Sequence, residues 1–192
     1  MVKTENFIKV EIKSAAELRN WLVVNCEQKE SIWLVTYKKQ ILDKYVSVQE
    51  VLDELICFGW IDGIRRKLDE NKTMQLISPR QVQHWTKTYK DRFNKLVKEG
   101  RMTDAGRNAV LLSKEKGLWD FMDDVDKLIK SADFFNALNK YPPALQNFDG
   151  FGNASKRFML RYIKIAKTPA TRQKRINEIT MLAQEGKKLK GS

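Results

Sequence analysis

The sequence is poor in the residues that build most metal and thiol sites. Its 192 residues contain one histidine, His84, and two cysteines, Cys26 and Cys57, which form no CxxC pair. A site made of several histidines cannot be assembled from one, so we expect no metal and no cofactor. Both cysteines lie among apolar residues in predicted helices. Buried free thiols in a reducing cytosol are therefore expected rather than a disulfide.

Long apolar runs are also missing. No stretch approaches the ~20 consecutive apolar residues of a membrane-spanning helix, and residues 1–20 lack the apolar centre of a signal peptide. Hydrophobic residues make up 42% of the chain and charged residues 31%. This balance is typical of a soluble globular protein of one domain, or of one domain with a helical appendage. We expect a cytoplasmic protein.

Catalytic motifs are equally scarce. A Ser-His-Asp triad would have to use His84, yet no G-x-S-x-G turn is present. The stretch "GFGNASK" at 150–156 lacks the spacing of a phosphate-binding loop, and no G-x-G-x-x-G follows a strand. No catalytic constellation is complete, which favours a non-enzymatic protein. An enzyme in which Asp62 serves as an acid–base group is a third alternative, and it would need a partly buried Asp62.

Positive charge, by contrast, is abundant and uneven. The formal net charge is +12. Residues 156–192 hold eleven Lys and Arg against Glu178 and Glu185, a net charge of +9, which leaves +3 for the first 155 residues. Such a tail attracts polyanions, whether nucleic acid, anionic lipid or an acidic protein face. A solvated helix face explains the same pattern equally well.

Local signals predict the elements of the first half. Ser14–Glu17 and Ser47–Glu50 have the form of capping boxes, which open helices. The first helix would run to about Cys26 and the second to Gly59, a residue suited to a left-handed helix end. Residues 31–39 between them predict a strand.

The next segment predicts a hairpin followed by a helix. Residues 64–69 and 73–78 form two short runs with a polar break, and Asp62-Gly63 before them is typical of a turn. Ser78-Pro79 is expected to start the following helical part, because Pro suits the first turn of a helix. That helix would continue through 82–100.

From about residue 80 onward the pattern is mostly helical. We therefore predict an α+β fold, with a small, mostly antiparallel sheet in the N-terminal half. The loop around "FDGFGNASK" suggests an α+β core domain over 1–150 and a basic helical C-terminal extension over 151–192, packed on the core. The further predicted helices span 103–116, 131–140, 144–148, 154–166 and 169–186.

Two segments that flank the predicted hairpin combine tryptophan with arginine. A helix start favours negative charge, and an arginine there would hold a carboxylate or phosphate through two parallel hydrogen bonds. We therefore predict a surface that binds a small anion or an acidic protein. The alternative is that both tryptophans are core anchors and the arginines are surface residues or pair with Asp62 or Asp69. The candidate ligand-binding residues are Trp60, Asp62, Arg65, Arg80, Trp85 and Lys87.

A second hypothesis is nucleic-acid binding through the last two helices. Two consecutive helices with a short joint and many cations resemble DNA-binding helix pairs only weakly. Apolar residues of the first of these helices, among them Phe158 and Met159, are expected to pack against the domain. The oligomeric state is not predicted. The candidate cations are Lys164, Lys167, Arg172, Lys174 and Arg175.

Four stretches together resemble a known family. They are "WLVTYKK", "CFGWIDGIRRKLDE", "SPRQVQHWTKTYKDRFNKLVKEGRMTDAG" and "AKTPATRQKRINEITMLAQEGKKLK". In their order and length they resemble the YdeI/OmpD-associated family, also described as bacteriocin-protection proteins, over about Ala15 to Lys188. The resemblance implies a soluble cytoplasmic protein of bacterial origin, associated with envelope stress and tolerance of cationic antimicrobial peptides. It implies no reaction and no cofactor.

Overall fold

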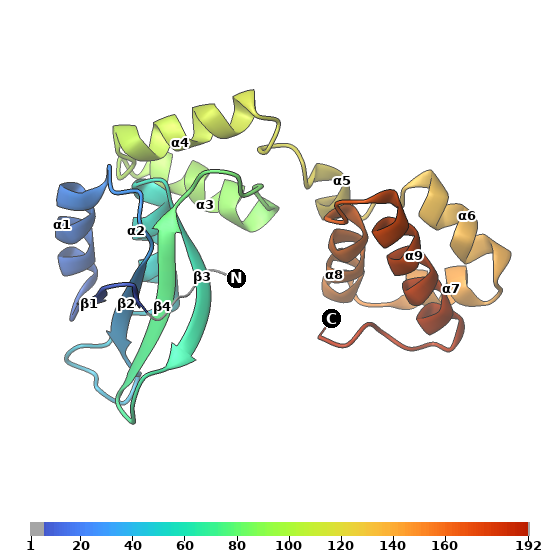
Figure 1. The fold of residues 1–192 in the computed structure, drawn as a ribbon, viewed down its shortest axis with the longest axis horizontal. Coiled ribbons are helices and arrows are strands. Elements are labelled where there is room, and N and C mark those ends of the chain that lie inside the picture. Colours follow the sequence, from blue (N-terminus) through green and yellow to red (C-terminus); the bar gives the residue numbers. More distant parts are fainter. Residues whose placement is uncertain (1–5, 192) are drawn as a thin grey trace. The chain divides into compact units, whose positions relative to one another are not determined.

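The chain forms two compact units, which divide between Asp120 and Phe121. The structure is a computed structural model, and it describes residues 6–191 (Figure 1). We call residues up to Asp120 the N-terminal unit and those from Phe121 the C-terminal unit. The sequence placed this division later, between residues 150 and 151.

The N-terminal unit is built on a four-stranded mixed sheet in the order β1-β2-β4-β3. Strand β1 pairs with β2 in parallel, and the other two pairings are antiparallel. The predicted α+β class is therefore confirmed. The elements are β1 (Lys9–Glu11), α1 (Ala15–Asn25), β2 (Ile32–Tyr37), α2 (Val48–Cys57), β3 (Trp60–Lys67), β4 (Lys72–Pro79), α3 (Lys87–Lys98) and α4 (Asp104–Glu115).

The first two helices begin where their capping residues predict. The hydroxyl of Ser47 accepts a hydrogen bond from the Glu50 amide, and the Glu50 carboxylate accepts one from the Ser47 amide, so this capping box is complete. The hydroxyl of Ser14 caps α1 in the same way, but Glu17 reaches the amide of Lys13 instead of that of Ser14. Side chains thus satisfy the free amides that a helix start exposes.

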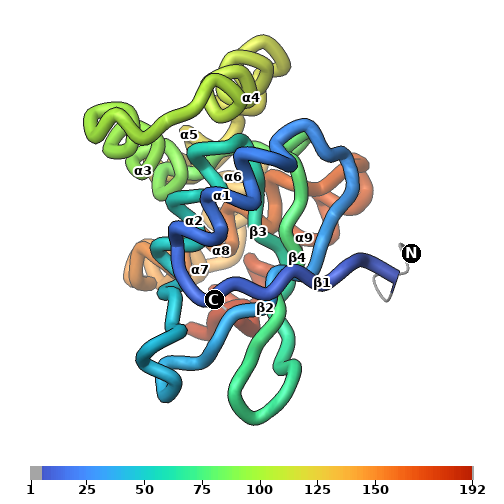
Figure 2. The backbone as a smooth tube through the Cα atoms, turned by 90° about the vertical axis from the view of Figure 1, so that its left-hand side faces the viewer, coloured from blue at the N-terminus to red at the C-terminus, as the bar shows by residue number. Residues whose placement is uncertain are grey.

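Helices α1 and α2 supply the core on one face of the sheet. Leu22 of α1 and Leu55 of α2 are fully buried in one cluster with Ile32 of β2 and Ile77 of β4. Figure 2 shows the two helices side by side along the strands. Strand β2 is buried on both faces, since Trp33 and Val35 are 2% exposed as well. A strand buried on both faces reads as a continuous apolar run, as this one does.

Two predictions around the hairpin are wrong. Asp62-Gly63 is not a turn but lies inside β3, where the register with β4 shifts between Asp62 and Arg65. A β-bulge explains the glycine, because a Cβ there would lie 3.2 Å from the Leu76 carbonyl oxygen. Ser78-Pro79 likewise ends β4 instead of starting a helix, and Pro79 pairs with Trp60.

Close packing of α4 against the end of α2 depends on two glycines. Gly59 has φ +72°, the left-handed conformation that the sequence predicts for this helix end. A Cβ on Gly59 would lie 2.7 Å from the Ala109 Cβ, and one on Gly106 would lie 2.2 Å from the Cys57 carbonyl oxygen. The Thr103 hydroxyl donates to that same carbonyl at 2.6 Å. Residues 57–63 are therefore held by neighbouring elements on both sides.

The C-terminal unit is a helical bundle with its own core. Phe134 of α6 and Phe148 of α7 pack edge to face, 5.1 Å between ring centroids, in one cluster with Met159 of α8 and Ile176 of α9. This core explains why the unit begins at Phe121 and not at 151, because α6 and α7 belong to it. Its helices are α5 (Asp123–Asp126), α6 (Ala132–Lys140), α7 (Ala144–Gly150), α8 (Asn153–Lys164) and α9 (Pro169–Gln184).

Among the described residues, no helix combines the length and the apolar character needed to cross a membrane.

Candidate functional site

Arg80 is the centre of the first predicted site, and it is buried. It follows β4, and its amide donates to the Gly59 carbonyl oxygen at 2.8 Å. Its guanidinium carbon lies 4.0 Å from the centroid of the Trp85 ring and 5.0 Å from that of Tyr89. Nη1 donates to the carbonyls of Gln83 and His84. Arg80 is therefore a cation held between aromatic faces and backbone carbonyls.

Burial has an electrostatic cost at Arg80. The side chain is 7% exposed, and its Nε and Nη2 have no hydrogen-bond partner within the part of the chain described. Desolvation lowers the pKa of Arg80 to about 10, while Tyr89 and Asp62 oppose that shift. The site does not lie at a helix start, because α3 begins only at Lys87. The helix N-terminus that was expected beside Arg80, and that would favour a bound anion, is therefore not found there.

Asp62 belongs to a hydrogen-bond chain that joins β3, β4 and α3. Its carboxylate accepts one bond from the Tyr89 hydroxyl and another from Gln75 Nε2 at 3.2 Å. Gln75 Oε1 in turn accepts from Arg65 Nη2 at 2.5 Å. Arg65 is exposed and Asp62 is half-buried. Both carboxylate oxygens are therefore committed to neighbouring side chains, as expected for a residue that fixes α3 on the sheet.

The two tryptophans have different aromatic neighbours. Trp60 is fully buried and packs edge to face on Trp21, with 5.5 Å between ring centroids. Trp85 is 1% exposed and packs on Tyr89, Phe93 and Trp119. The structure thus brings Asp62, Arg80 and Trp85 together around Tyr89 and places Trp60 elsewhere, in the core.

Lys87 stands apart from this cluster. Its side chain is exposed and pairs with Asp91 at 2.5 Å, one helical turn along α3. The sequence analysis missed Tyr89, which is the residue that connects Asp62 to Arg80. The four-residue spacing of Trp85, Tyr89 and Phe93 within the helix predicted over 82–100 is the signal that would have found it.

A second charged cluster of the N-terminal unit was not predicted. Asp53 and Glu54 on α2 are 8% and 4% exposed. Glu54 accepts from Arg19 at 2.8 Å and from Arg101 at 2.7 Å, and Asp53 accepts from Arg92. The cluster joins α1, α2, α3 and the segment before α4. Its carboxylates are neutralised by arginines of the same unit, so it leaves no free anion.

In the C-terminal unit, two of the five predicted cations are in ion pairs. Arg172 donates to both oxygens of Asp133, at 2.7 and 2.9 Å, and to the Ser131 hydroxyl at 2.8 Å. The Arg172 guanidinium holds the pKa of the Asp133 carboxyl well below its ordinary value. Lys164 pairs with Asp124 at 2.5 Å. These contacts join α9 to α6 and α8 to α5.

The other three predicted cations are arranged differently. Arg175 donates to the Tyr162 carbonyl at 2.5 Å and lies over the Tyr162 ring at 4.2 Å. Lys167 and Lys174 are exposed, and neither has an ion pair or hydrogen bond within residues 6–191. Only these two of the five are therefore available to a polyanion without breaking a contact.

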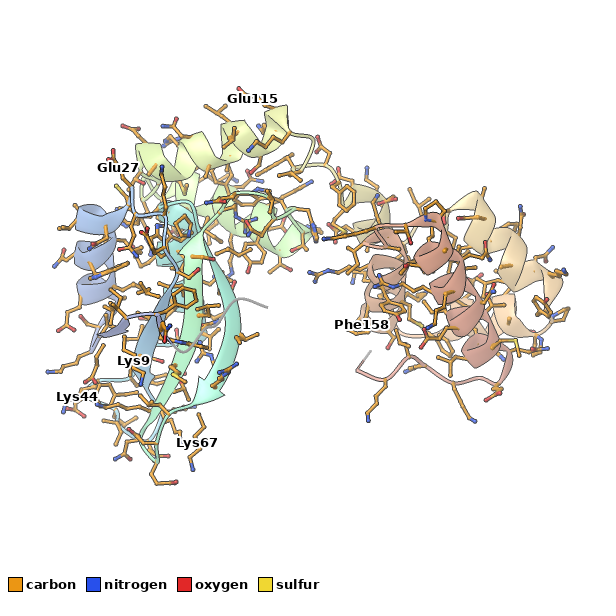
Figure 3. All side chains as sticks on the ribbon, in the orientation of Figure 1. Lys9, Glu27, Lys44, Lys67, Glu115 and Phe158 are labelled. Atoms are coloured by element: carbon orange, nitrogen blue, oxygen red, sulfur yellow. The ribbon has the colours of Figure 1, made fainter. Side chains whose placement is uncertain are left out.

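Among the hollows on the surface of the C-terminal unit, two are lined by residues of α8. The first, about 130 Å³, lies between the two ion pairs and is lined by Lys164, Arg172, Asp124 and Ser131 together with apolar side chains. Its cations are already neutralised by Asp124 and Asp133. The second, about 210 Å³, lies on the outer face of α8 and is lined by Phe158, Arg161, Tyr162 and Ile165. Figure 3 marks Phe158 on this helix.

Comparison with known proteins divides the chain in the same way. Residues 10–109 match the family model of a domain of unknown function (DUF8412), and residues 128–186 match that of the family described as bacteriocin-protection, YdeI or OmpD-associated. The first match spans just over half of the chain. The searches of curated proteins and of solved structures gave no match.

These matches define a protein of two family domains. The chain belongs to the DUF8412 family through its N-terminal unit, and its C-terminal unit carries the YdeI/OmpD-associated domain. The resemblance to the latter family is thereby confirmed for the last of the four quoted stretches. The stretches around "GWIDG" and "SPR" fall within the other family's match.

Proposed function

We propose that the protein is a non-enzymatic binding protein whose C-terminal unit binds an acidic partner. One observation carries the proposal. Residues 121–192 hold fourteen Lys and Arg against seven Asp and Glu, a net charge of +7. Among the described residues, five of these cations are exposed and have no ion pair, hydrogen bond or aromatic-ring contact with the protein. They are Lys127, Arg161, Lys167, Lys174 and Lys190.

An acidic protein suits this arrangement better than a small anion at the N-terminal unit. The guanidinium of Arg80 is buried, and the nearby carboxylate of Asp62 repels a second negative charge. Exposed cations in the C-terminal unit, in contrast, lose little hydration before they meet a partner. They would speed the encounter with the partner, fix its orientation and contribute to its affinity at low salt.

Nucleic acid is the second choice, because three of the five predicted contact residues are engaged within the unit. On duplex DNA, log affinity falls with log salt by roughly 0.9 for each phosphate neutralised, so five free cations would give a slope of about −4.5 and two a slope of about −2. Lys167 and Lys174, the two predicted contact residues that are free, would by themselves give the shallower slope.

The proposal also bears on peptide tolerance. A unit of net charge +7 repels a cationic antimicrobial peptide, so a direct complex with such a peptide is disfavoured. We propose that any role in tolerance or envelope stress runs through the acidic partner. A cytoplasmic location is part of this proposal, and the free thiols of Cys26 and Cys57 support it.

The experiment measures the anisotropy of fluorescently labelled polyglutamate and of labelled duplex DNA with the full chain across a range of salt concentrations. We expect polyglutamate to bind at low salt, to weaken as screening increases, and to weaken in the triple variant Arg161→Gln, Lys167→Gln, Lys174→Gln. Absence of polyglutamate binding at low salt would remove the proposal. DNA binding with a slope near −4.5, together with weak polyglutamate binding, would replace it with the nucleic-acid function.

A further inference from the structure

Helix α8 carries apolar residues on two sides, and only one of them belongs to the core. Met159, Leu160 and Ile163 are buried in the C-terminal unit. Phe158 and Ile165 lie on the other side and are 42% and 40% exposed. Phe158, Tyr162 and Ile165 are spaced by four and three residues, which places them in one stripe along the helix. This outer stripe lines the second hollow described above. Tyr162 also packs against the core, whereas Phe158 and Ile165 do not belong to it.

The base of the hollow is fixed by α9. The Arg175 guanidinium lies over the Tyr162 ring, and the Tyr162 hydroxyl donates to Glu178 at 3.1 Å. The tyrosine is therefore held from two sides before any partner arrives. A surface that is already ordered binds with a smaller loss of side-chain freedom than one that must order on contact.

Several cations lie on or next to the segments that form this apolar stripe. Arg161 is one of its lining residues, and Lys167 follows Ile165 by two positions. The end of the chain brings another, because a Cβ on Gly191 would lie 3.7 Å from the Phe158 ring and Lys190 directly precedes it. Glu178 is the carboxylate bonded to the hydroxyl of Tyr162. The surface is thus apolar in the middle and mainly basic around it.

We infer that the acidic partner is a protein segment that carries an apolar anchor, and that the anchor occupies the α8 hollow while its carboxylates meet the surrounding cations. This inference rests on the proposed function and adds the class of partner. A buried apolar anchor with a charged rim is the usual arrangement of an amphipathic segment in a groove. A second copy of this chain fits poorly, since its own α8 surface carries the same positive charge.

The test compares two labelled acidic peptides with the full chain. One is polyglutamate, and the other is polyglutamate with leucine and phenylalanine at helical spacing. Burying one such side chain raises affinity by roughly tenfold or more, so we expect the anchored peptide to bind wild type at least that much more tightly. Phe158→Ser should abolish this gain and leave polyglutamate binding unchanged.

A matched control lies on α6. Phe135 is 43% exposed, so Phe135→Ser removes the same side chain from the same degree of exposure elsewhere in the unit and should keep the gain. Ile165→Ser provides a second change within the hollow, and circular dichroism checks that each variant is folded.

The outcomes separate the two proposals. Equal binding of both peptides to wild type overturns the anchor and leaves the acidic-partner function standing, whereas failure of both peptides at low salt overturns both. A gain that survives Phe158→Ser and Ile165→Ser also overturns the anchor. Labelled single-stranded DNA is the remaining arm, because a base would stack on Phe158. If that DNA binds in a Phe158-dependent way and the anchored peptide shows no gain, the hollow belongs to nucleic acid.

Discussion

Both units place an arginine on an aromatic ring, but the surroundings of the two arginines differ. In the N-terminal unit, Arg80 is 7% exposed between Trp85 and Tyr89. In the C-terminal unit, Arg175 lies over Tyr162 beside a surface that solvent reaches. The same pair of residue types therefore stabilises a core in one unit and orders an exposed hollow in the other.

The two units also differ in how their carboxylates are paired with cations. Asp53 and Glu54 of the N-terminal unit are buried and are matched by three arginines. The C-terminal unit has half as many acids as cations and leaves several cations exposed. Charge in the N-terminal unit thus holds helices together, whereas surplus charge in the C-terminal unit is available to a partner.

The largest expected effect is the loss of stability when a buried tryptophan is removed from the core of the N-terminal unit. Trp60 is fully buried, so Trp60→Ala should lower the free energy of unfolding of that unit by roughly 3–5 kcal/mol through lost burial and a cavity. Urea denaturation followed by tryptophan fluorescence measures it. Val82→Ala, at a side chain 70% exposed, is the control and should change stability little. A Trp60→Ala variant of wild-type stability that loses binding of a ligand would instead make Trp60 a site residue.

A smaller loss of stability is expected when a buried carboxylate of the N-terminal unit is neutralised. Glu54→Gln removes the charge that accepts from Arg19 and Arg101, and bonds to charged groups contribute about 1.5–3 kcal/mol each. Because both arginines are about one-third exposed, we expect a total loss near 2 kcal/mol in urea denaturation.

The matched control for that change is Glu99→Gln. Glu99 pairs with Arg101 and Lys95 at the surface, so its loss should cost less than about 1 kcal/mol. Equal losses at Glu54 and Glu99 would show that burial does not distinguish the two carboxylates.

The third prediction concerns pH and the C-terminal unit. Arg172 holds the pKa of Asp133 below its ordinary value in the folded state, so the pair stabilises the unit above pH ~4, the ordinary pKa of such a carboxyl. That contribution is lost as the pH falls through the lower, folded-state pKa. Since Asp133 is 45% exposed, solvent reduces it to about 1 kcal/mol. Asp133→Asn should therefore lower the free energy of unfolding by about that amount at pH 7.

Urea denaturation of wild type and Asp133→Asn at pH 7 and at progressively lower pH provides the measurement. The difference between the two proteins should shrink as the pH falls below ~4, where the carboxylate of the unfolded wild type takes up protons, and should vanish below the lower pKa of the folded state. A difference that stays constant with pH would mean that the Asn side chain, and not the lost charge, causes the destabilisation.

The smallest effect is an expected absence of binding. A ligand at 100 times its dissociation constant adds about 2.7 kcal/mol of stability. Because Arg80 is enclosed, we expect phosphate and citrate to shift the melting temperature of wild type and Arg80→Met equally. A shift that only wild type shows would restore a small-anion site in the N-terminal unit.

Local signals predicted most helices, because their causes lie within a few residues. The hydroxyls of Ser14, Ser47, Thr103 and Thr168 each cap the helix that was expected after them. Strand β1 and the division at Asp120 were not predicted. Both depend on contacts between distant segments, such as the pairing of β1 with β2 and the packing of Phe134 on Phe148.

The candidate sites were limited by burial, which residue type alone does not determine. Trp85 and Arg80 have the composition of a binding surface, but packing on Tyr89 and Trp119 encloses them. Asp62-Gly63 has the composition of a turn, but the bulge opposite Leu76 places it within a strand. On α8 the sequence pattern did not predict that Met159 is buried while the neighbouring Phe158 is exposed.

The most direct test of the account compares two triple variants that remove the same charge. The first variant changes three exposed cations of the C-terminal unit and is Arg161→Gln, Lys167→Gln, Lys174→Gln. The second changes three exposed cations of the N-terminal unit and is Lys39→Gln, Lys98→Gln, Arg107→Gln. Polyglutamate anisotropy at low salt should show a loss of affinity of roughly tenfold or more for the first variant and a much smaller loss for the second. Equal losses would mean that polyglutamate responds only to net charge, and would contradict a binding surface in the C-terminal unit.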